Sequence, residues 1–210
     1  MQTCVFHRIP VRYAAMGKNI VRFKCHHCGH CCRDVICLPT PWDVIRLVRE
    51  TGANPYEFIE FVGPDDISEV PKSDPTWLRC NGKRYMMALR RNEHGCYFLH
   101  PNTRHCTAYE ARPLLCRLYP KKLHESRQGD FKAFSLHTNV GCPRHRDGIV
   151  HTAPLYDLYL SDRDHQEDYM DMVQVFNRDK SPNKRPIDFL ALFIAGIARP
   201  DGLEESAVYE

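Results

Sequence analysis

One stretch of eight residues constrains this chain more than any other. It reads CHHCGHCC, from Cys25 to Cys32, and contains two successive C-x₂-C steps. Two residues between thiolates let a tight loop turn several sulfurs toward one point, and Gly29 permits the backbone angles and close approach that such a loop requires. The spacing therefore predicts that Cys25, Cys28 and Cys31 surround one metal centre.

The number of cysteines allows two opposite interpretations. The chain has 11 cysteines in 210 residues, which suits either a secreted disulfide framework or intracellular thiols and metal ligands. Basic residues interrupt every apolar run in residues 1–24, so no signal peptide is expected. The longest apolar stretch, residues 189–198, is far shorter than the roughly 20 residues that cross a bilayer. We therefore expect a cytoplasmic protein with no membrane span.

The net charge identifies no partner. The formal charge of +3 is too small to predict a nucleic-acid partner, which calls for a concentrated basic face. Two [4Fe–4S]²⁺ cores, each carrying roughly −2 with its four thiolates, would reverse even that sign. Any redox or protein partner is therefore unknown at this stage.

Local signals elsewhere predict an α+β fold: a small, loop-rich metal-binding domain with short helices, a β-hairpin and C-terminal helices. We expect a cysteine domain over residues 1–150 and a helical extension, residues 151–210, packed on it. Asn81-Gly82 is a favoured two-residue hairpin turn, and Thr40-Pro41-Trp42-Asp43 has the form of a helix start. The predicted strands are 20–23, 77–80, 84–89 and 131–136; the predicted helices are 41–51, 55–61, 154–177 and 186–198, with a helical turn at 107–112.

A second group of cysteines recurs with nine residues between successive members, at Cys96, Cys106 and Cys116. That spacing alone does not force the thiols to converge, so their context matters. Cys96 opens the motif CYFL, and CTAYEARPLLC runs from Cys106 to Cys116, followed by Tyr119-Pro120. The later Cys142-Pro143 has the form of the cysteine–proline pair of bacterial ferredoxins.

Together these motifs resemble the YkgJ-type cysteine-cluster family (CxxCxxCC), described as zinc- or iron-chelating domains. The family's C-x₂-C-x₂-C-C matches Cys25 to Cys32 without a gap, and its C-x-F-L and C-x-x-Y-x-x-R-P-x-x-C patterns match from Cys96 to Cys116. The match spans about residues 21 to 145. The resemblance implies metal or cluster binding. One branch is similar to flagellin lysine methylases, which use S-adenosylmethionine, but we find no glycine-rich methyl-donor loop in this sequence.

Eight thiols carry the family pattern, and we expect them to bind the cofactor or metal. The grouping that spacing suggests places one set around a first centre, Cys25, Cys28, Cys31 and Cys142. It places the other set around a second centre, Cys32, Cys96, Cys106 and Cys116. Neighbouring side chains generally point in different directions, so Cys31 and Cys32 are not expected to bind the same iron. Cys32 is expected either to face a second site or to be a buried spectator. A single cluster that uses part of the set is the other interpretation.

The spacing also bears on which metal is bound. Three thiols in a row favour iron–sulfur, with one or two [4Fe–4S] clusters and a redox or cluster-dependent role. Zinc favours two-plus-two spacing, so a zinc-binding structural or metal-handling protein is the alternative. A methylase-like enzyme built on the cysteine domain is the third possibility, and no catalytic residue can be assigned from the sequence.

The remaining candidates surround these thiols. Arg112 and Arg117 are expected to donate hydrogen bonds to sulfur and offset its charge, with an ordinary salt bridge as the alternative for Arg112. Tyr109 is expected in the apolar wall that excludes water. The histidines within the first cluster are not required as ligands, because the thiols suffice. The cysteines that stand alone are interpreted as buried free thiols; they are Cys4, Cys37 and Cys80.

Overall fold

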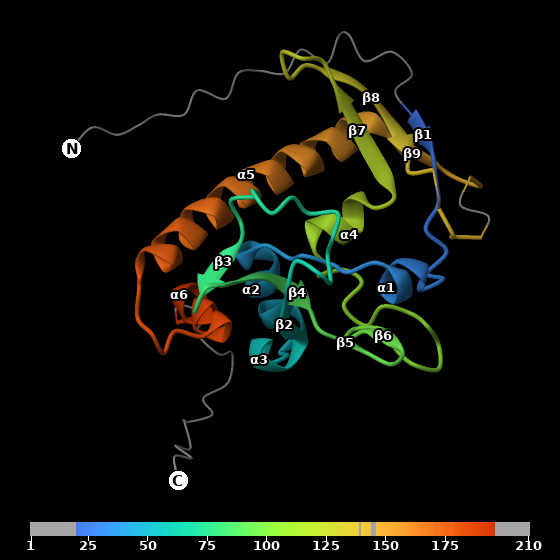
Figure 1. The fold of residues 1–210 in the computed structure, drawn as a ribbon. Coiled ribbons are helices and arrows are strands. Elements are labelled where there is room, and N and C mark those ends of the chain that lie inside the picture. The colour runs from blue at the N-terminus through green and yellow to red at the C-terminus, as the bar shows by residue number, and fades with distance from the viewer. Residues whose placement is uncertain (1–19, 139, 144–145, 196–210) are drawn as a thin grey trace.

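The computed structural model describes residues 20–138, 140–143 and 146–195. The fold combines short helices and small antiparallel sheets with a long helix near the C-terminus, which runs along one edge of the molecule (Figure 1). This architecture confirms the predicted α+β class. In chain order the elements are β1 (Ile20–Arg22), α1 (His30–Asp34), α2 (Pro41–Thr51), α3 (Pro55–Phe58), β2 (Ile59–Val62), β3 (Leu78–Cys80), β4 (Lys83–Leu89), β5 (Arg91–Asn92), β6 (Gly95–Cys96), α4 (Leu114–Leu118), β7 (Lys121–Glu125), β8 (Phe131–Leu136), β9 (Ile149–His151), α5 (Thr152–Arg178), the 3₁₀ helix η2 (Pro186–Leu190) and α6 (Ala191–Ile194).

Helix α2 begins and ends where the sequence signals predicted. The Asp43 N–H donates to Oγ1 of Thr40 at 3.3 Å, and the Asp43 carboxylate accepts from the Thr40 N–H at 3.0 Å. These two hydrogen bonds form a reciprocal capping box. Gly52 ends the helix in the left-handed region, with φ of 68°. The apolar face of α2 is fully buried through Val44 and Leu47.

In the three-stranded sheet the strand order is β2-β4-β3. Asn81 and Gly82 both have positive φ and join β3 to β4, which confirms the predicted hairpin. The prediction of a helix through Phe61 was wrong after Phe58. Residues 59–62 form β2 instead, because pairing with β4 buries Ile59 opposite Leu89. Such cross-strand packing outweighs the local helix signal.

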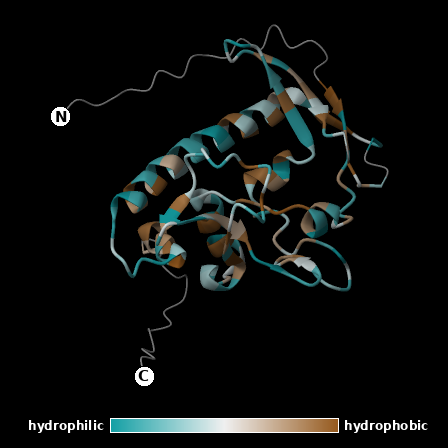
Figure 2. Ribbon diagram, viewed as in Figure 1, coloured by the Kyte–Doolittle hydropathy of each residue, from teal (hydrophilic) through white to brown (hydrophobic). Residues whose placement is uncertain are grey.

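The long helix α5 confirms the helix predicted over residues 154–177. It contacts α2, α4 and β3, and its turns alternate between hydrophilic and hydrophobic (Figure 2), as expected of a helix that buries one face. Val173 of α5 and Phe189 of η2 are fully buried in one apolar cluster with Val44 of α2. None of the described helices is long and apolar enough to cross a bilayer.

Two sequence-based interpretations extend beyond the described residues. Cys4, interpreted as a buried free thiol, lies outside them, and so does the end of the predicted last helix after residue 195. The described beginning of that last helix is the 3₁₀ helix η2 followed by α6. The boundary between two parts at residue 150 stays a prediction.

A half-buried carboxyl on α5 makes stability depend on pH. Burial, and then the charge of Asp43, raise the pKa of Asp162 to about 6, and its Oδ1 has no hydrogen-bond partner within the part of the chain that the structure describes. In the unfolded chain this carboxyl ionises near pH 4. Keeping Asp162 charged in the folded state therefore lowers the free energy of unfolding. This loss begins near pH 4, grows as the pH rises, and reaches its full size above about pH 6.

Replacing Asp162 by asparagine is thus expected to raise the free energy of unfolding at pH 8. The gain should be about 1 kcal/mol once solvent screening is allowed for, and it should largely vanish at pH 4. Urea denaturation at the two pH values measures it, with the exposed Asp164→Asn as the matched control. An equal change at both pH values would contradict this explanation.

Candidate metal centre

Nine cysteines line one cavity of about 260 Å³. All ten cysteines in the described part of the chain are thiols and not disulfides. The tenth, Cys80, is buried but does not line the cavity. The nine are the eight that carry the motifs and one that we had interpreted as isolated: Cys25, Cys28, Cys31, Cys32, Cys37, Cys96, Cys106, Cys116 and Cys142.

Cys142 meets the thiols of the first cluster although it lies more than 100 residues along the chain. Its side chain shares a hydrogen bond with Cys28, and it is within electrostatic range of Cys31 and Cys25. Burial, followed by the contact with Cys28, raises the pKa of Cys142 to about 12. The members of the first predicted set therefore gather on one part of the cavity wall.

Two glycines allow the backbone around the first cluster to pack closely against neighbouring residues. Gly29 precedes α1 with φ of 70°, and a Cβ there would lie 2.8 Å from the carbonyl oxygen of Arg104. Both the backbone angle and the close approach were expected of this position. A Cβ on Gly141 would lie 2.3 Å from the ring of His30, so the chain beside Cys142 can reach α1 only because residue 141 has no side chain.

His30 holds the Cys142 segment through its ring. Its Nε2 accepts from the Gly141 N–H at 3.2 Å, and its Nδ1 lies 2.7 Å from the Asp34 carboxylate. This pairing assigns the ring proton to Nδ1. Because both nitrogens are engaged, His30 in this arrangement positions a cysteine and does not coordinate metal.

Cys31 and Cys32 are closer together than we expected. Their sulfurs lie 4.0 Å apart, because both residues are on α1, where consecutive side chains diverge by only about 100°. Cys32 also shares a side-chain hydrogen bond with Cys106. Its thiol lies between the first cluster and the second group of cysteines.

Contacts among these three thiols separate their pKa values. The hydrogen bond from Cys32 is the largest effect on both partners, and it lowers the pKa of Cys31 and that of Cys106 to about 7. The same two hydrogen bonds, with Cys106 first, raise the pKa of Cys32 well above its ordinary range. Thiolates are the metal-binding form of cysteine, so Cys31 and Cys106 are poised to bind near neutral pH.

The second group is completed by two contacts deeper in the fold. Burial raises the pKa of Cys96 to about 12, and the nearby charges of Cys116 and Cys106 act in the same direction. Cys116 Sγ donates to Cys37 Sγ at 3.4 Å, and this contact, followed by burial, raises the pKa of Cys37 well above its usual value. Sequence reasoning missed Cys37 because no spacing signal connects it with Cys116, 79 residues away.

A stack of side chains forms part of the cavity wall. The Arg112 guanidinium lies 3.7 Å from the centre of the Tyr109 ring, and the ring centroid of His27 lies 4.0 Å from that of Tyr109. Two groups this close to one ring must occupy its opposite faces. The Tyr109 side chain also shares a hydrogen bond with Cys25, so the stack borders the first cluster.

The two arginines predicted beside the thiols differ in their contacts. Arg112 lines the cavity, and its buried Nε has no hydrogen-bond partner among the described residues. Arg117 also lines the cavity, but it donates to the backbone carbonyls of Arg112, at 3.2 Å, and Glu110. Arg112 thus has a donor to offer to sulfur, whereas Arg117 supports the loop.

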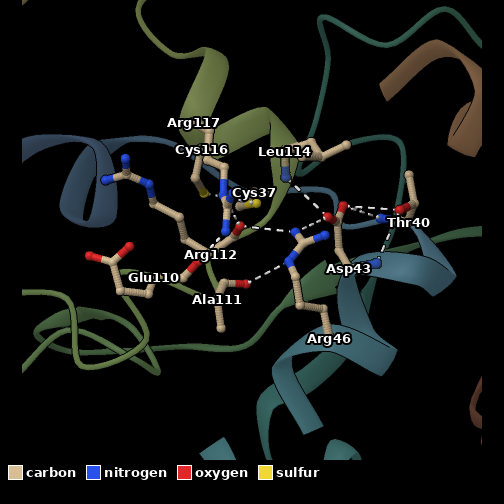
Figure 3. A network of polar contacts seen from close by, with 10 residues as sticks. All are labelled: Cys37, Thr40, Asp43, Arg46, Glu110, Ala111, Arg112, Leu114, Cys116 and Arg117. Atoms are coloured by element: carbon tan, nitrogen blue, oxygen red, sulfur yellow. Dashed lines mark hydrogen bonds and ion pairs between the residues drawn. The ribbon is translucent and has the colours of Figure 1, made fainter. Parts of the chain in front are cut away.

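A buried carboxylate fixes the segment that precedes Cys116 (Figure 3). Asp43 is 1% exposed and accepts from the Leu114 N–H at 3.0 Å, in addition to its capping bonds. Arg46 pairs with Asp43 at 2.5 Å and donates to the carbonyls of Ala111 and Arg112 at 3.2 and 3.0 Å. The first turn of α2 therefore anchors the start of α4, which carries Cys116.

The donor chemistry suits soft metals, because thiolates select zinc, copper(I) and iron–sulfur clusters. Seven of the nine cavity thiols stand in contacting groups, two pairs and one triad. Among the described residues, no three or more Cys, His, Asp or Glu side chains are arranged to hold a single metal ion.

Comparison with known proteins gives one match. Residues 24–143 match the model of the family CxxCxxCC, described as "Putative zinc- or iron-chelating domain". That range includes all nine cavity cysteines. No curated protein and no solved structure matches the chain.

Proposed function

Because the chain belongs to the CxxCxxCC family of zinc- or iron-chelating domains, we propose that its clustered thiols bind one or two [4Fe–4S] centres with a redox or cluster-dependent role. The observation that carries this proposal is the convergence of nine thiols on one cavity. The cavity, about 260 Å³, holds roughly nine times the volume that one molecule occupies in liquid water. Such a space suits a polynuclear centre better than one ion.

The spacing of the thiols supports the same choice. A tetrahedral zinc ion with Zn–S bonds of about 2.3 Å needs four sulfurs mutually about 3.8 Å apart. No group of three donors in the described ranges meets such a requirement. A cluster carries its own bridging sulfides, so its ligand thiolates stand farther apart. A cavity lined by nine thiols, in which no three of the described donors are placed around one ion, therefore favours iron–sulfur.

We retain the two sets predicted from spacing as the ligands of two centres. Contacts of Cys142 with Cys28, and its proximity to Cys31 and Cys25, support the first set. The contact of Cys32 with Cys106, and the proximity of Cys96 to Cys116 and Cys106, support the second. A bound [4Fe–4S] centre would supply one-electron transfer.

The surrounding side chains would adjust the charge and hydration of such centres. Arg112 places an unpartnered donor in the wall, where it would compensate thiolate charge. Tyr109, between Arg112 and His27, would exclude water beside Cys25 and hydrogen-bond to that sulfur.

Replacing Arg112 by glutamine is expected to lower the reduction potential of the protein, since a positive charge that favours the reduced, more negative state is lost. A screened charge interaction of about 1 kcal/mol corresponds to on the order of 40 mV for one electron. Dye-mediated potentiometry measures the midpoint. The exposed Lys122→Gln serves as the control. Equal midpoint potentials for the two variants would show that Arg112 does not raise the reduction potential of the centre.

Zinc binding with a structural or metal-handling role is the second candidate. Two sulfur pairs favour it, because Cys31–Cys32 at 4.0 Å and Cys37–Cys116 at 3.4 Å approach the edge length of a zinc–thiolate tetrahedron. The methylase-like alternative stays a prediction that no contact in the structure favours.

The two candidates differ in colour and magnetism. Protein purified without oxygen should be brown, absorb broadly near 400 nm, and give an electron paramagnetic resonance signal after reduction with dithionite if iron–sulfur is bound. Colourless protein with stoichiometric zinc and no such signal would establish the zinc candidate instead.

A further inference from the structure

Cys37 lies outside the motifs that define the family, yet it faces the same cavity. It follows α1 in the segment that leads to α2 and is 8% exposed. Its carbonyl accepts from the Leu89 N–H at 2.9 Å, which fixes the backbone beside β4. Its sulfur lies 3.4 Å from that of Cys116 and within electrostatic range of Cys96. Figure 3 shows the side chains of Cys37 and Cys116 side by side.

The surroundings of Cys37 differ from those of an ordinary buried thiol. Cys80 is also buried, at 3% exposed, but it lies outside the cavity. Its sulfur makes no contact with another described thiol comparable to that between Cys37 and Cys116. Two sulfurs bound to one tetrahedral metal are about 3.8 Å apart. A sulfur already 3.4 Å from that of Cys116 needs a shift of only a few tenths of an ångström to share a single ion with it. To bind separate irons of one iron–sulfur cluster, the two neighbouring sulfurs would move farther apart.

We propose that Cys37 coordinates the same metal centre as Cys116, as a fifth thiol of the second group. This inference rests on the proposed metal-binding function. It also changes the assignment of Cys32, which is no longer needed as a ligand of the second centre. Cys32 contacts both Cys31 and Cys106 and so lies between the two groups. With Cys37 present, the second centre has four thiols without Cys32: Cys37, Cys96, Cys106 and Cys116.

The test compares three alanine variants of the full chain, Cys37→Ala, Cys116→Ala and Cys80→Ala, titrated with Co²⁺ under reducing, oxygen-free conditions. The thiolate-to-cobalt charge-transfer band reports sulfur ligation directly. We expect Cys37→Ala and Cys116→Ala to weaken Co²⁺ binding at one centre by at least about tenfold and to lower the band equally, because each removes one thiolate ligand. Cys80→Ala should match the wild type. A Cys37→Ala titration that matches Cys80→Ala would overturn the proposal.

A second measurement on the wild-type chain avoids any folding defect of the variants. In protein loaded with ¹¹³Cd²⁺, scalar coupling between the metal and the β-protons of a cysteine identifies that cysteine as a ligand. We expect coupling at Cys37 and Cys116, and coupling at Cys116 without Cys37 would overturn the inference alone. A wild-type chain that binds neither Co²⁺ nor Cd²⁺, and takes up no iron and sulfide on anaerobic reconstitution, would instead refute the proposed function on which the inference rests.

Discussion

Replacing Cys28 by serine is expected to remove about half of the bound metal, because one of two four-thiolate centres loses a ligand. Cys28 shares a hydrogen bond with Cys142 and lines the cavity with the rest of the first set. A serine hydroxyl is a harder and poorer ligand than a thiolate for iron or zinc. The thiols of the second group remain in place, so the second centre should persist.

Metal analysis of anaerobically purified variants measures this effect. Cys80→Ser is the matched control, because Cys80 is buried but lies outside the cavity, and it should retain the wild-type content. Full metal content in Cys28→Ser would refute the assignment of the first centre. Complete loss would instead favour a single cluster that draws on thiols of both sets.

Replacing Asp43 by alanine is expected to lower the free energy of unfolding by about 3–5 kcal/mol, the usual loss when one partner of a buried ion pair is removed. The carboxylate is 1% exposed and accepts from Thr40, Arg46 and the Leu114 N–H. Without it, the Arg46 charge and the Leu114 N–H lose their partner in a site with little access to water. Guanidinium denaturation of the reduced, metal-loaded protein measures the loss.

A second aspartate in the first turn of a helix, Asp188 of η2, provides the control. Asp188 accepts from the Arg185 N–H at 2.8 Å and pairs with the Arg185 guanidinium, as Asp43 does with Thr40 and Arg46. Its side chain is 38% exposed, so Asp188→Ala should cost about 1 kcal/mol or less. Similar losses for the two variants would show that burial of the Asp43 network does not stabilise the fold as we describe.

The Asp43 network also connects stability with the metal site. Asp43 and Arg46 hold the backbone from Ala111 to Leu114, two residues before Cys116. Asp43→Ala should therefore weaken metal retention at the second group more than at the first. Chelator competition on the folded variant compares the two.

Features that depend on a few neighbouring residues could be predicted from the sequence. The Thr40–Asp43 capping box, the Asn81-Gly82 hairpin and the left-handed Gly29 all follow from local sterics and hydrogen bonding. The cysteine motif from Cys25 to Cys32 and its family resemblance likewise predicted a chelating domain.

Features that depend on distant partners could not be predicted. The segment from Ile59 is a strand only because β4 lies beside it. Asp43 reaches Leu114 across 71 positions, and Cys37 reaches Cys116 across 79. Neither contact leaves a periodic or spacing signal in a single sequence. His30 presents a related case: the sequence did not require it as a ligand, but nothing in the sequence indicated that its ring would hold Gly141.

The most direct test of the account is the amount of iron, acid-labile sulfide and zinc in wild-type protein purified and kept without oxygen. The account predicts equal amounts of iron and sulfide, about four or about eight of each per chain, for one or two [4Fe–4S] clusters. Protein that is fully reduced and folded under these conditions, yet carries neither iron with sulfide nor zinc, would contradict the claim that its converging thiols share metal.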